Sequence, residues 1–249
     1  MAAHFVKRLD EAELGCLSET TLVSSVSPTL GTWAKAKTNK PVQVLPHGYE
    51  PSPPCIPLSD AAVTSLLNHG QAGIVFYYAG VLLYQRSLVP LFKAAKAIAE
   101  DRKTPCHVIY SGPHEAIARA QAETVGAGHL LVSTGQITRS EATYIMSRAT
   151  ANVVVISDDY EYMYPGKLWD SMAVGRPIII IGKPDGDSAR LISERGLGLV
   201  LPPFEEPDVS NILEKLRSFD NADLGSKSQD LQAARVYDAF VHGLEGLRT

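Results

Sequence analysis

Pro165-Gly-Lys-Leu-Trp-Asp-Ser-Met-Ala-Val-Gly-Arg-Pro177, followed at once by Ile178-Ile-Ile-Ile181, is the stretch of sequence that decides the fold. Its Ala-x-Gly-x-Pro turn leads from a helix into a strand whose apolar run indicates burial on both faces. The helix start would attract phosphate, because a helix N-terminus presents free N–H groups and the positive end of the dipole. Lys167 and Asp170 lie three residues apart and therefore share a helix face. A cation and a carboxylate in this arrangement fit a diphosphate and the hydroxyls of a ribose.

Strands and helices alternate on both sides of this stretch, and each expected strand is a nearly continuous apolar run. Such alternation indicates parallel strands joined by right-handed crossovers. The sequence therefore predicts an α/β fold, with a Rossmann-like open parallel sheet and helices on both faces. The expected strands are 73–78, 107–110, 130–133, 152–157, 177–181 and 198–201. The expected helices are 87–100, 113–125, 139–149, 166–174, 187–195, 207–218 and 227–246.

The beginning of the chain has a different organisation. Its expected elements are a helix over 4–18, a strand over 21–26, a helix over 28–37 and a strand over 42–45. A proline-rich connector then follows, which is typical of a linker. We therefore expect three parts: residues 1–50, a linker over 51–58, and a larger domain over 59–249.

Composition and charge argue against several classes of protein. The chain has 249 residues, of which 45% are hydrophobic, as in an ordinary soluble protein with a sizeable core. A net charge of -4 without a basic block argues against a dedicated nucleic-acid binder. We expect no membrane span, because no apolar run of about 18 residues occurs, and no signal peptide, because the first ten residues contain no apolar h-region.

Cysteine and histidine do not indicate a metal centre. The three cysteines, Cys16, Cys55 and Cys106, are odd in number and far apart, so we expect neither a zinc site nor a disulfide framework. This usage favours a reducing cytosol, and hence a cytoplasmic location. The seven histidines show no metal-ligand spacing, and we expect no metal site.

The loops beyond the carboxyl ends of the strands are the candidate site, because ligands of an open α/β sheet bind there. Gly80, Ser111-Gly112 and Gly135-Gln136 begin three of these loops, and glycine lets a backbone approach a phosphate closely. Arg86 stands at a helix start, where it would either clamp a phosphate or lie on the surface along its helix. No G-x-G-x-x-G or P-loop sequence occurs, so the nicotinamide and ATPase classes lack their signatures.

Three segments, in the right order, resemble the C-terminal, donor-binding half of a retaining GT-B glycosyltransferase. Leu45-Pro-His-Gly-Tyr49 is similar to the "pNG" turn that enters that domain, and Tyr78-Ala-Gly80 through Arg86-Ser87 resembles its "G-R-L-x-x-x-K-G" loop. Lys167-Leu-Trp-Asp-Ser-Met-Ala-Val-Gly-Arg-Pro177 resembles its "K-L-x-E-x-M-A-x-G-x-P" segment, which is the most specific match. The resemblance covers the chain from about residue 20 to its end.

The resemblance implies a role for several side chains. Arg86 stands in place of the diphosphate-binding lysine, and Asp170 in place of the acid that holds the ribose. Gln136 and Ile137 lie where the family frames the base. Tyr162 occupies the position of the family's first acid, and Val81 that of an arginine. The candidate donor-binding residues are Gly80, Arg86, Ser111, Gly112, Gln136, Ile137, Tyr162, Gly166, Lys167 and Asp170.

Tyr162 stands where the family has an acid, and two acids lie near it in the sequence. Glu161 or Asp159 would supply the displaced carboxylate, or both are solvated loop residues. No nucleophile or general base is evident, so the catalytic residues stay unassigned. We expect no metal and no cofactor besides the nucleotide-diphosphate sugar itself.

The resemblance implies an enzyme that transfers a sugar, in the manner of a hexosyltransferase, from a nucleotide-diphosphate sugar to an acceptor in polysaccharide or glycoconjugate synthesis. Residues 1–50 then correspond to the tail of an acceptor domain with its crossover, and 59–249 to the donor domain. The rest of the acceptor half would come from an N-terminal domain or a partner chain, through which peripheral membrane association would occur. Two alternatives remain: a non-catalytic nucleotide-sugar-binding or assembly subunit, and a nucleotide-sugar epimerase.

Overall fold

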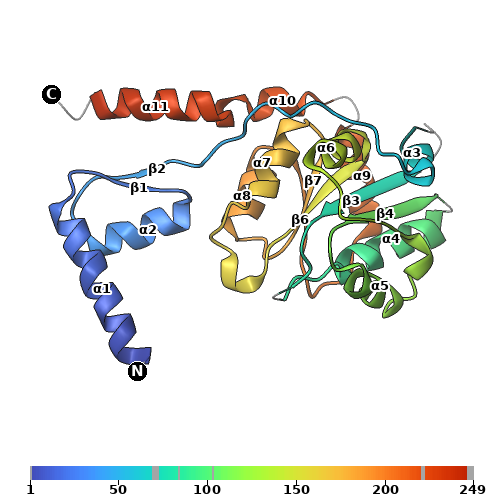
Figure 1. Cartoon of the computed structure of the whole chain (residues 1–249), viewed down its shortest axis with the longest axis horizontal. Helices are drawn as coiled ribbons and strands as arrows, with labels where there is room; N and C mark the ends of the chain where they lie inside the picture. The colour runs from blue at the N-terminus through green and yellow to red at the C-terminus, as the bar shows by residue number, and fades with distance from the viewer. Residues whose placement is uncertain (1, 69–72, 84, 103, 220–221, 246–249) are drawn as a thin grey trace.

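A computed structural model of the chain describes residues 2–68, 73–83, 85–102, 104–219 and 222–245. Figure 1 shows a large α/β unit, a small N-terminal unit beside it, and a long C-terminal helix that returns over the small unit. An extended segment without helix or strand leads from the small unit to the large one.

A parallel sheet of six strands forms the centre of the large unit in the described part of the chain. Its strands are β3 (Ile74–Ala79), β4 (Cys106–Ser111), β5 (Leu131–Gly135), β6 (Ala151–Val155), β7 (Ile178–Ile181) and β8 (Gly198–Leu201). They lie in the order β5-β4-β3-β6-β7-β8, so the winding direction reverses between β3 and β6. The carboxyl edge at this reversal is where ligands of such sheets bind. The predicted Rossmann-like open parallel sheet is confirmed.

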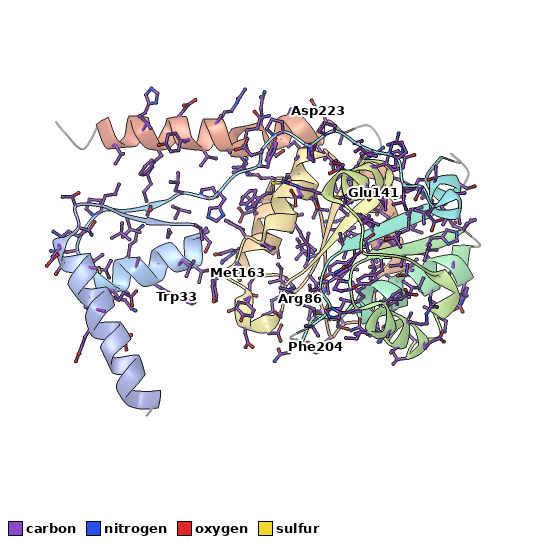
Figure 2. The ribbon with its side chains drawn as sticks, in the orientation of Figure 1. Trp33, Arg86, Glu141, Met163, Phe204 and Asp223 are labelled. Carbon is purple, nitrogen blue, oxygen red and sulfur yellow. The ribbon has the colours of Figure 1, made fainter. Side chains whose placement is uncertain are left out.

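Figure 2 locates the carboxyl edge of the sheet. Arg86, Met163 and Phe204 follow β3, β6 and β8 in the sequence, and they lie at the same edge, whereas Asp223 lies at the opposite one. The loops that were expected to form the site therefore share one side of the sheet.

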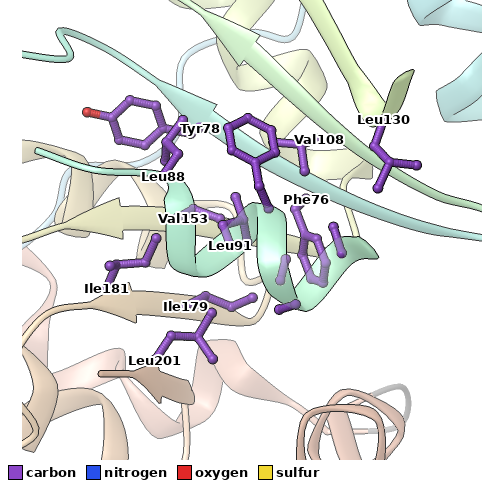
Figure 3. Packing of buried hydrophobic residues seen from close by; sticks show 14 of the residues in the cluster. Phe76, Tyr78, Leu88, Leu91, Val108, Leu130, Val153, Ile179, Ile181 and Leu201 are labelled. Carbon is purple, nitrogen blue, oxygen red and sulfur yellow. The ribbon is translucent and has the colours of Figure 1, made fainter. Parts of the chain in front are cut away.

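Helices cover both faces of the sheet. One face packs against α4 (Val89–Arg102), α5 (Glu115–Glu123) and α9 (Val209–Phe219). The other packs against α3 (Ala61–Asn68), α6 (Arg139–Arg148), α7 (Gly166–Ala173), α8 (Asp187–Glu194) and α10 (Leu224–Lys227). Figure 3 shows the first interface, where Phe76 and Val108 of the sheet meet Leu91 of α4. These side chains are fully buried, and burying such a side chain contributes about 1.5–3 kcal/mol.

The N-terminal unit contains α1 (Ala2–Glu19), β1 (Val23–Ser25), α2 (Pro28–Lys37) and β2 (Val42–Val44). The two strands pair in parallel, and Ser27 caps α2 by accepting a hydrogen bond from the Leu30 N–H. The last helix, α11 (Ala233–Glu245), runs back over this unit, with Gly243 beside Gln43 of β2 (Figure 1). The closing helix therefore crosses back onto the N-terminal part of the chain.

A buried carboxylate joins α2 to the large unit. The Asp187 side chain, at the start of α8, is fully buried. It accepts hydrogen bonds from the Thr29 N–H at 3.0 Å, from the Thr29 hydroxyl at 2.9 Å and from Arg190 at 2.9 Å. Because a buried charge is costly unless it is paired and hydrogen-bonded, this contact fixes where α2 lies.

The Thr29→Val substitution is expected to lower the free energy of unfolding by about 1.5 kcal/mol, because it removes a hydrogen bond to a buried carboxylate. The control is Thr32→Val on the same helix, whose exposed hydroxyl donates to the Pro28 carbonyl of its own helix. That control should change stability by no more than about 0.5 kcal/mol. Urea denaturation measures both values, and equal stabilities for the two variants would contradict the joining role of Asp187.

Most expected elements of the large unit are present, with ends displaced by at most two residues. One helix was not predicted: α3 lies between residues 58 and 73. It is capped by Asp60 Oδ1, which accepts from the Ala62 and Val63 N–H groups. The division of the chain at a linker over 51–58 stays a prediction.

The expected single helix over 227–246 is instead α10, a 3-10 turn over Gln229–Leu231 and then α11; residue 246 lies outside the described residues. The break allows Tyr49 to pair with the chain between these helices: its N–H donates to the Leu231 carbonyl, and its own carbonyl accepts from the Ala233 N–H. A continuous helix would not leave these groups free.

Candidate functional site

A cavity of about 450 Å³ opens at the carboxyl edge where the winding reverses. It extends inward between α6 and α7, over β3 and β6. Seven of the ten candidate residues line it, namely Gly80, Ser111, Gly112, Gln136, Ile137, Lys167 and Asp170. Arg86, Tyr162 and Gly166 do not line it. Residues from four separate segments therefore meet at one site, as expected for loops at one edge of a parallel sheet.

Lys167 is held tightly against the end of β3. Its ammonium lies 5.3 Å from the centre of the Tyr78 ring, and its side chain crosses Gly80. A Cβ atom on Gly80 would lie only 1.8 Å from Nζ, and the φ of Gly80 is +140°, so this position requires glycine. Burial lowers the pKa of Lys167, and the nearby Arg86 lowers it further. The ammonium is thus a partly desolvated cation, which an anion would stabilise.

The start of α7 adds to the positive potential. Gly166 is its first residue, directly before Lys167, and the N-cap Pro165 makes no side-chain capping hydrogen bond. Helix N-termini without a side-chain cap are available to anions. Arg86 donates to the Val81 carbonyl at 3.4 Å and acts on Lys167 electrostatically. Lys167, which lines the cavity, therefore lies next to an uncapped helix start and close enough to Arg86 to interact with it electrostatically.

Hydrogen bonds between the ends of β3 and β4 form the wall opposite α7. The Gly80 N–H donates to the Ser111 carbonyl at 2.7 Å, and the Tyr110 hydroxyl donates to the Gly80 carbonyl at 2.9 Å. Gly112 lies against this pair, since a Cβ there would be 2.3 Å from the Gly80 carbonyl oxygen. The backbone can approach a ligand on this side without obstruction from side chains.

Asp170 forms an ion pair that was not predicted from the sequence. Its carboxylate pairs with Arg139 of α6 at 2.6 Å, and both residues line the cavity. The pair is largely exposed, so it contributes little stability. Thr138 caps α6 in a capping box with Glu141, and this places Arg139 in the first turn. The capping signal Thr138-x-x-Glu141 is visible in the sequence, but the contact to α7 is not.

The side chains of Tyr162 and of the nearby acids Asp159 and Glu161 lie outside the cavity. The Tyr162 ring packs against Trp33 of α2, with ring centroids 5.1 Å apart. Glu161 pairs with Lys183 at 2.8 Å, and Asp159 is exposed.

The inner wall of the cavity contains further residues absent from the candidate set. Asn152 donates from Nδ2 to the Met146 carbonyl at 3.2 Å, and its Oδ1 has no hydrogen-bond partner among the described residues. Its position inside the apolar strand Ala151–Val155 was the available sequence signal. Ile137, Ala142 and Met146 supply apolar surface around it. The cavity thus combines a polar, cationic mouth with a mostly apolar interior, the usual character of a small-molecule site.

The described residues contain no helix that has both the length and the apolar character of a bilayer-spanning segment. They also contain no cluster of three or more histidine, cysteine, aspartate or glutamate side chains that could hold a metal ion.

Solved structures with a similar fold extend this description. The chain is similar to the sucrose-phosphate synthase of Thermosynechococcus elongatus, with a TM-score of 0.63 and 17% identity over 97% of this chain and 61% of that one. It is also similar to the HepE protein of Anabaena, solved with UDP-glucose, with a TM-score of 0.63 and 14% identity over 99% and 70%. A chain of the GtfA/B complex gives a TM-score of 0.62 and 13% identity over 95% and 47%. No family model and no curated protein matches the sequence.

These likenesses show that the large unit has the fold of the Rossmann-like C-terminal domain of GT-B glycosyltransferases. The chain spans about half of the GtfA/B chain and less than two thirds of the sucrose-phosphate synthase.

Proposed function

We propose that the cavity binds a nucleotide-diphosphate sugar, and that the chain is the donor-binding half of a glycosyltransferase of the hexosyltransferase kind. One observation carries the proposal: a desolvated Lys167 beside Arg86, at an uncapped helix start, with the carboxylate of Asp170 one turn further on. The cations suit a diphosphate, and the acid suits the vicinal hydroxyls of a ribose. The apolar interior then accommodates the base.

The same groups suggest how the chain would assist transfer. Negative charge develops on the diphosphate as the bond to the sugar breaks, and fixed cations in a partly desolvated site stabilise such charge strongly. Lys167, Arg86 and the α7 N-terminus would act in this way, with no step assigned to a metal. The acceptor would come from an N-terminal domain or a partner chain, and synthesis of a polysaccharide or glycoconjugate is the proposed context. The solved HepE protein, which contains UDP-glucose, supports this kind of ligand.

A specific observation favours one alternative. Tyr162 packs against Trp33, so the position of the family's first acid holds no carboxylate. This arrangement fits a subunit that binds a nucleotide sugar without catalysing transfer. Detecting donor hydrolysis or transfer after the acceptor half is supplied separates the enzyme from the binding subunit.

The proposal is tested by adding uridine, guanosine or adenosine diphosphate to the chain and measuring binding by thermal unfolding and by calorimetry. A ligand present at one hundred times its Kd should raise the free energy of unfolding by about 2.7 kcal/mol. The proposal fails if none of the three diphosphates, nor a nucleotide sugar derived from them, binds at millimolar concentration.

Asp170→Asn is expected to weaken nucleoside diphosphate binding by about 10- to 100-fold, because a charged hydrogen bond to the ribose is lost. Stability should change little, since the ion pair is exposed. Arg139→Gln is the matched control: it breaks the same ion pair but leaves the carboxylate free for the ribose. Calorimetry should therefore show affinity at least equal to that of the unmodified chain. A loss of the same size in both variants would mean that the ion pair, and not the acid, determines binding.

A further inference from the structure

Three aromatic rings, one from α2 and two from the loop before α7, pack against one another in a row. Trp33 of α2 packs against Tyr162, with ring centroids 5.1 Å apart, and Tyr162 packs against Tyr160, with centroids 6.3 Å apart. We call Trp33, Tyr160 and Tyr162 the aromatic platform. Trp33 is 51% exposed and Tyr160 is 45% exposed. Tyr164, by contrast, packs edge-on against the buried Trp169.

One residue fixes both halves of the platform. The Asp187 carboxylate binds the N–H and the hydroxyl of Thr29, which lies one turn before Trp33 on the same face of α2. The Asp187 N–H donates to the carbonyl of Glu161 at 2.8 Å, and the Ser188 hydroxyl donates to the Met163 carbonyl. These hydrogen bonds therefore fix α2 and the loop before α7, the two segments that carry the exposed rings. Such preorganisation reduces the entropic cost of binding.

A short segment of chain links the platform to the start of α7, where the diphosphate would bind. Tyr162 precedes Gly166, the first residue of α7, by four residues, which span at most about 14 Å of chain. In Figure 2, Met163 lies between Trp33 and Arg86 along the same edge of the molecule. A ring bound on the platform would thus lie near the donor sugar, which is joined to the distal phosphate.

We propose that the aromatic platform binds a saccharide ring of the acceptor, an inference that rests on the proposed function. A pyranose has one face of C–H groups, which packs against an aromatic ring, and an edge of hydroxyls that needs polar neighbours. Asp159, Glu161 and Lys183 supply such neighbours, with Asp159 exposed and Glu161 paired with Lys183 at 2.8 Å. Aromatic side chains with one apolar face and one wet end are suited to such mixed surfaces.

Fluorescence tests the platform directly, because the sequence contains two tryptophans. Trp169→Phe leaves Trp33 as the reporter and removes no hydrogen bond from the described residues, since the Trp169 Nε1 has no partner among them. In this variant, maltose, cellobiose, lactose and chitobiose are titrated up to about 50 mM, well above the millimolar Kd of a weak site. We expect at least one of them to shift or quench the emission of Trp33 saturably, with and without a nucleoside diphosphate.

Calorimetry then measures the affinity of four variants for the disaccharide that binds. Trp33→Ala and Tyr162→Ala should each weaken its binding about tenfold, while Trp33→Phe keeps most of the affinity. Tyr237→Ala, which removes an aromatic ring 65% exposed on α11, is the control and should leave saccharide binding unchanged. The affinity for the nucleoside diphosphate should be the same in Trp33→Ala, Trp33→Phe and Tyr237→Ala.

Other outcomes would overturn the proposal. If no disaccharide affects Trp33 while a nucleoside diphosphate still binds, the platform is not a saccharide site and the proposed donor site stands. If sedimentation shows a dimer that Trp33→Ala dissociates, the platform is an interface between two copies of the chain. If a disaccharide binds but no nucleoside diphosphate does, the proposed function fails and the assignment to an acceptor fails with it.

Discussion

Lys167→Met is expected to weaken nucleoside diphosphate binding by about 100-fold or more, because it removes a charge-assisted contact from a partly desolvated site. The same substitution should leave the empty chain at least as stable as the unmodified one. Burial and the nearby Arg86 lower the pKa of Lys167, which means that folding disfavours its charged form. Methionine keeps the length and the packing over Gly80 without the charge.

The pH dependence of stability gives this prediction a second readout. When the folded-state pKa of a lysine is lowered, the unfolded chain binds more protons between that pKa and the ordinary value of 10.5. The free energy of unfolding of the unmodified chain should therefore rise, relative to that of Lys167→Met, as the pH increases through this window. Lys93→Met on α4 is the control, since Lys93 pairs with the exposed Glu206 outside the cavity. Unchanged nucleotide affinity in Lys167→Met would contradict the assigned role.

Gly112→Ala is expected to lower the free energy of unfolding by about 2–3 kcal/mol, as for an overpacked interior position. The new Cβ would lie 2.3 Å from the Gly80 carbonyl oxygen and 2.5 Å from the Tyr110 hydroxyl oxygen. The first of these is backbone, which cannot move away without disturbing the ends of β3 and β4. Binding of a nucleoside diphosphate should weaken as well, because Gly80 is the residue against which Lys167 packs.

Gly166→Ala is the matched control for this substitution. Its Cβ would have no atom within 4 Å, and Gly166 is the first residue of α7. We expect it to stabilise the chain by up to about 1 kcal/mol, because alanine loses less backbone entropy than glycine in a helix. Urea denaturation measures both variants. A Gly112→Ala variant as stable as the unmodified chain would show that the two strand ends do not approach as closely as described.

The sequence predicted the sheet because its signals are local. The apolar runs of β7 and of the other strands, and the turn at Gly175-Arg-Pro177, depend on neighbouring residues only. Once the strands were expected to be parallel, Gly80, Ser111 and Lys167 were placed at one edge by topology alone. That is why so much of the cavity's mouth could be named in advance.

The contacts that sequence reasoning missed join residues far apart in the chain. Arg139 and Asp170 are 31 residues apart, and Thr29 and Asp187 are 158 apart. Each of these four side chains, taken alone, would be interpreted as a solvated charge or as a helix cap. Their pairing depends on how α6, α7 and α2 pack, which no local pattern specifies. The break before α11 has the same origin, because Tyr49 pairs with the chain there from across the fold.

A crystal structure of the chain with a bound nucleoside diphosphate tests the central claim most directly. The account predicts that the diphosphate lies within hydrogen-bonding distance of the Lys167 ammonium, at the start of α7, and that the ribose hydroxyls contact the carboxylate of Asp170. A nucleotide bound anywhere else, or a cavity still empty at a concentration that saturates the chain in solution, would contradict it.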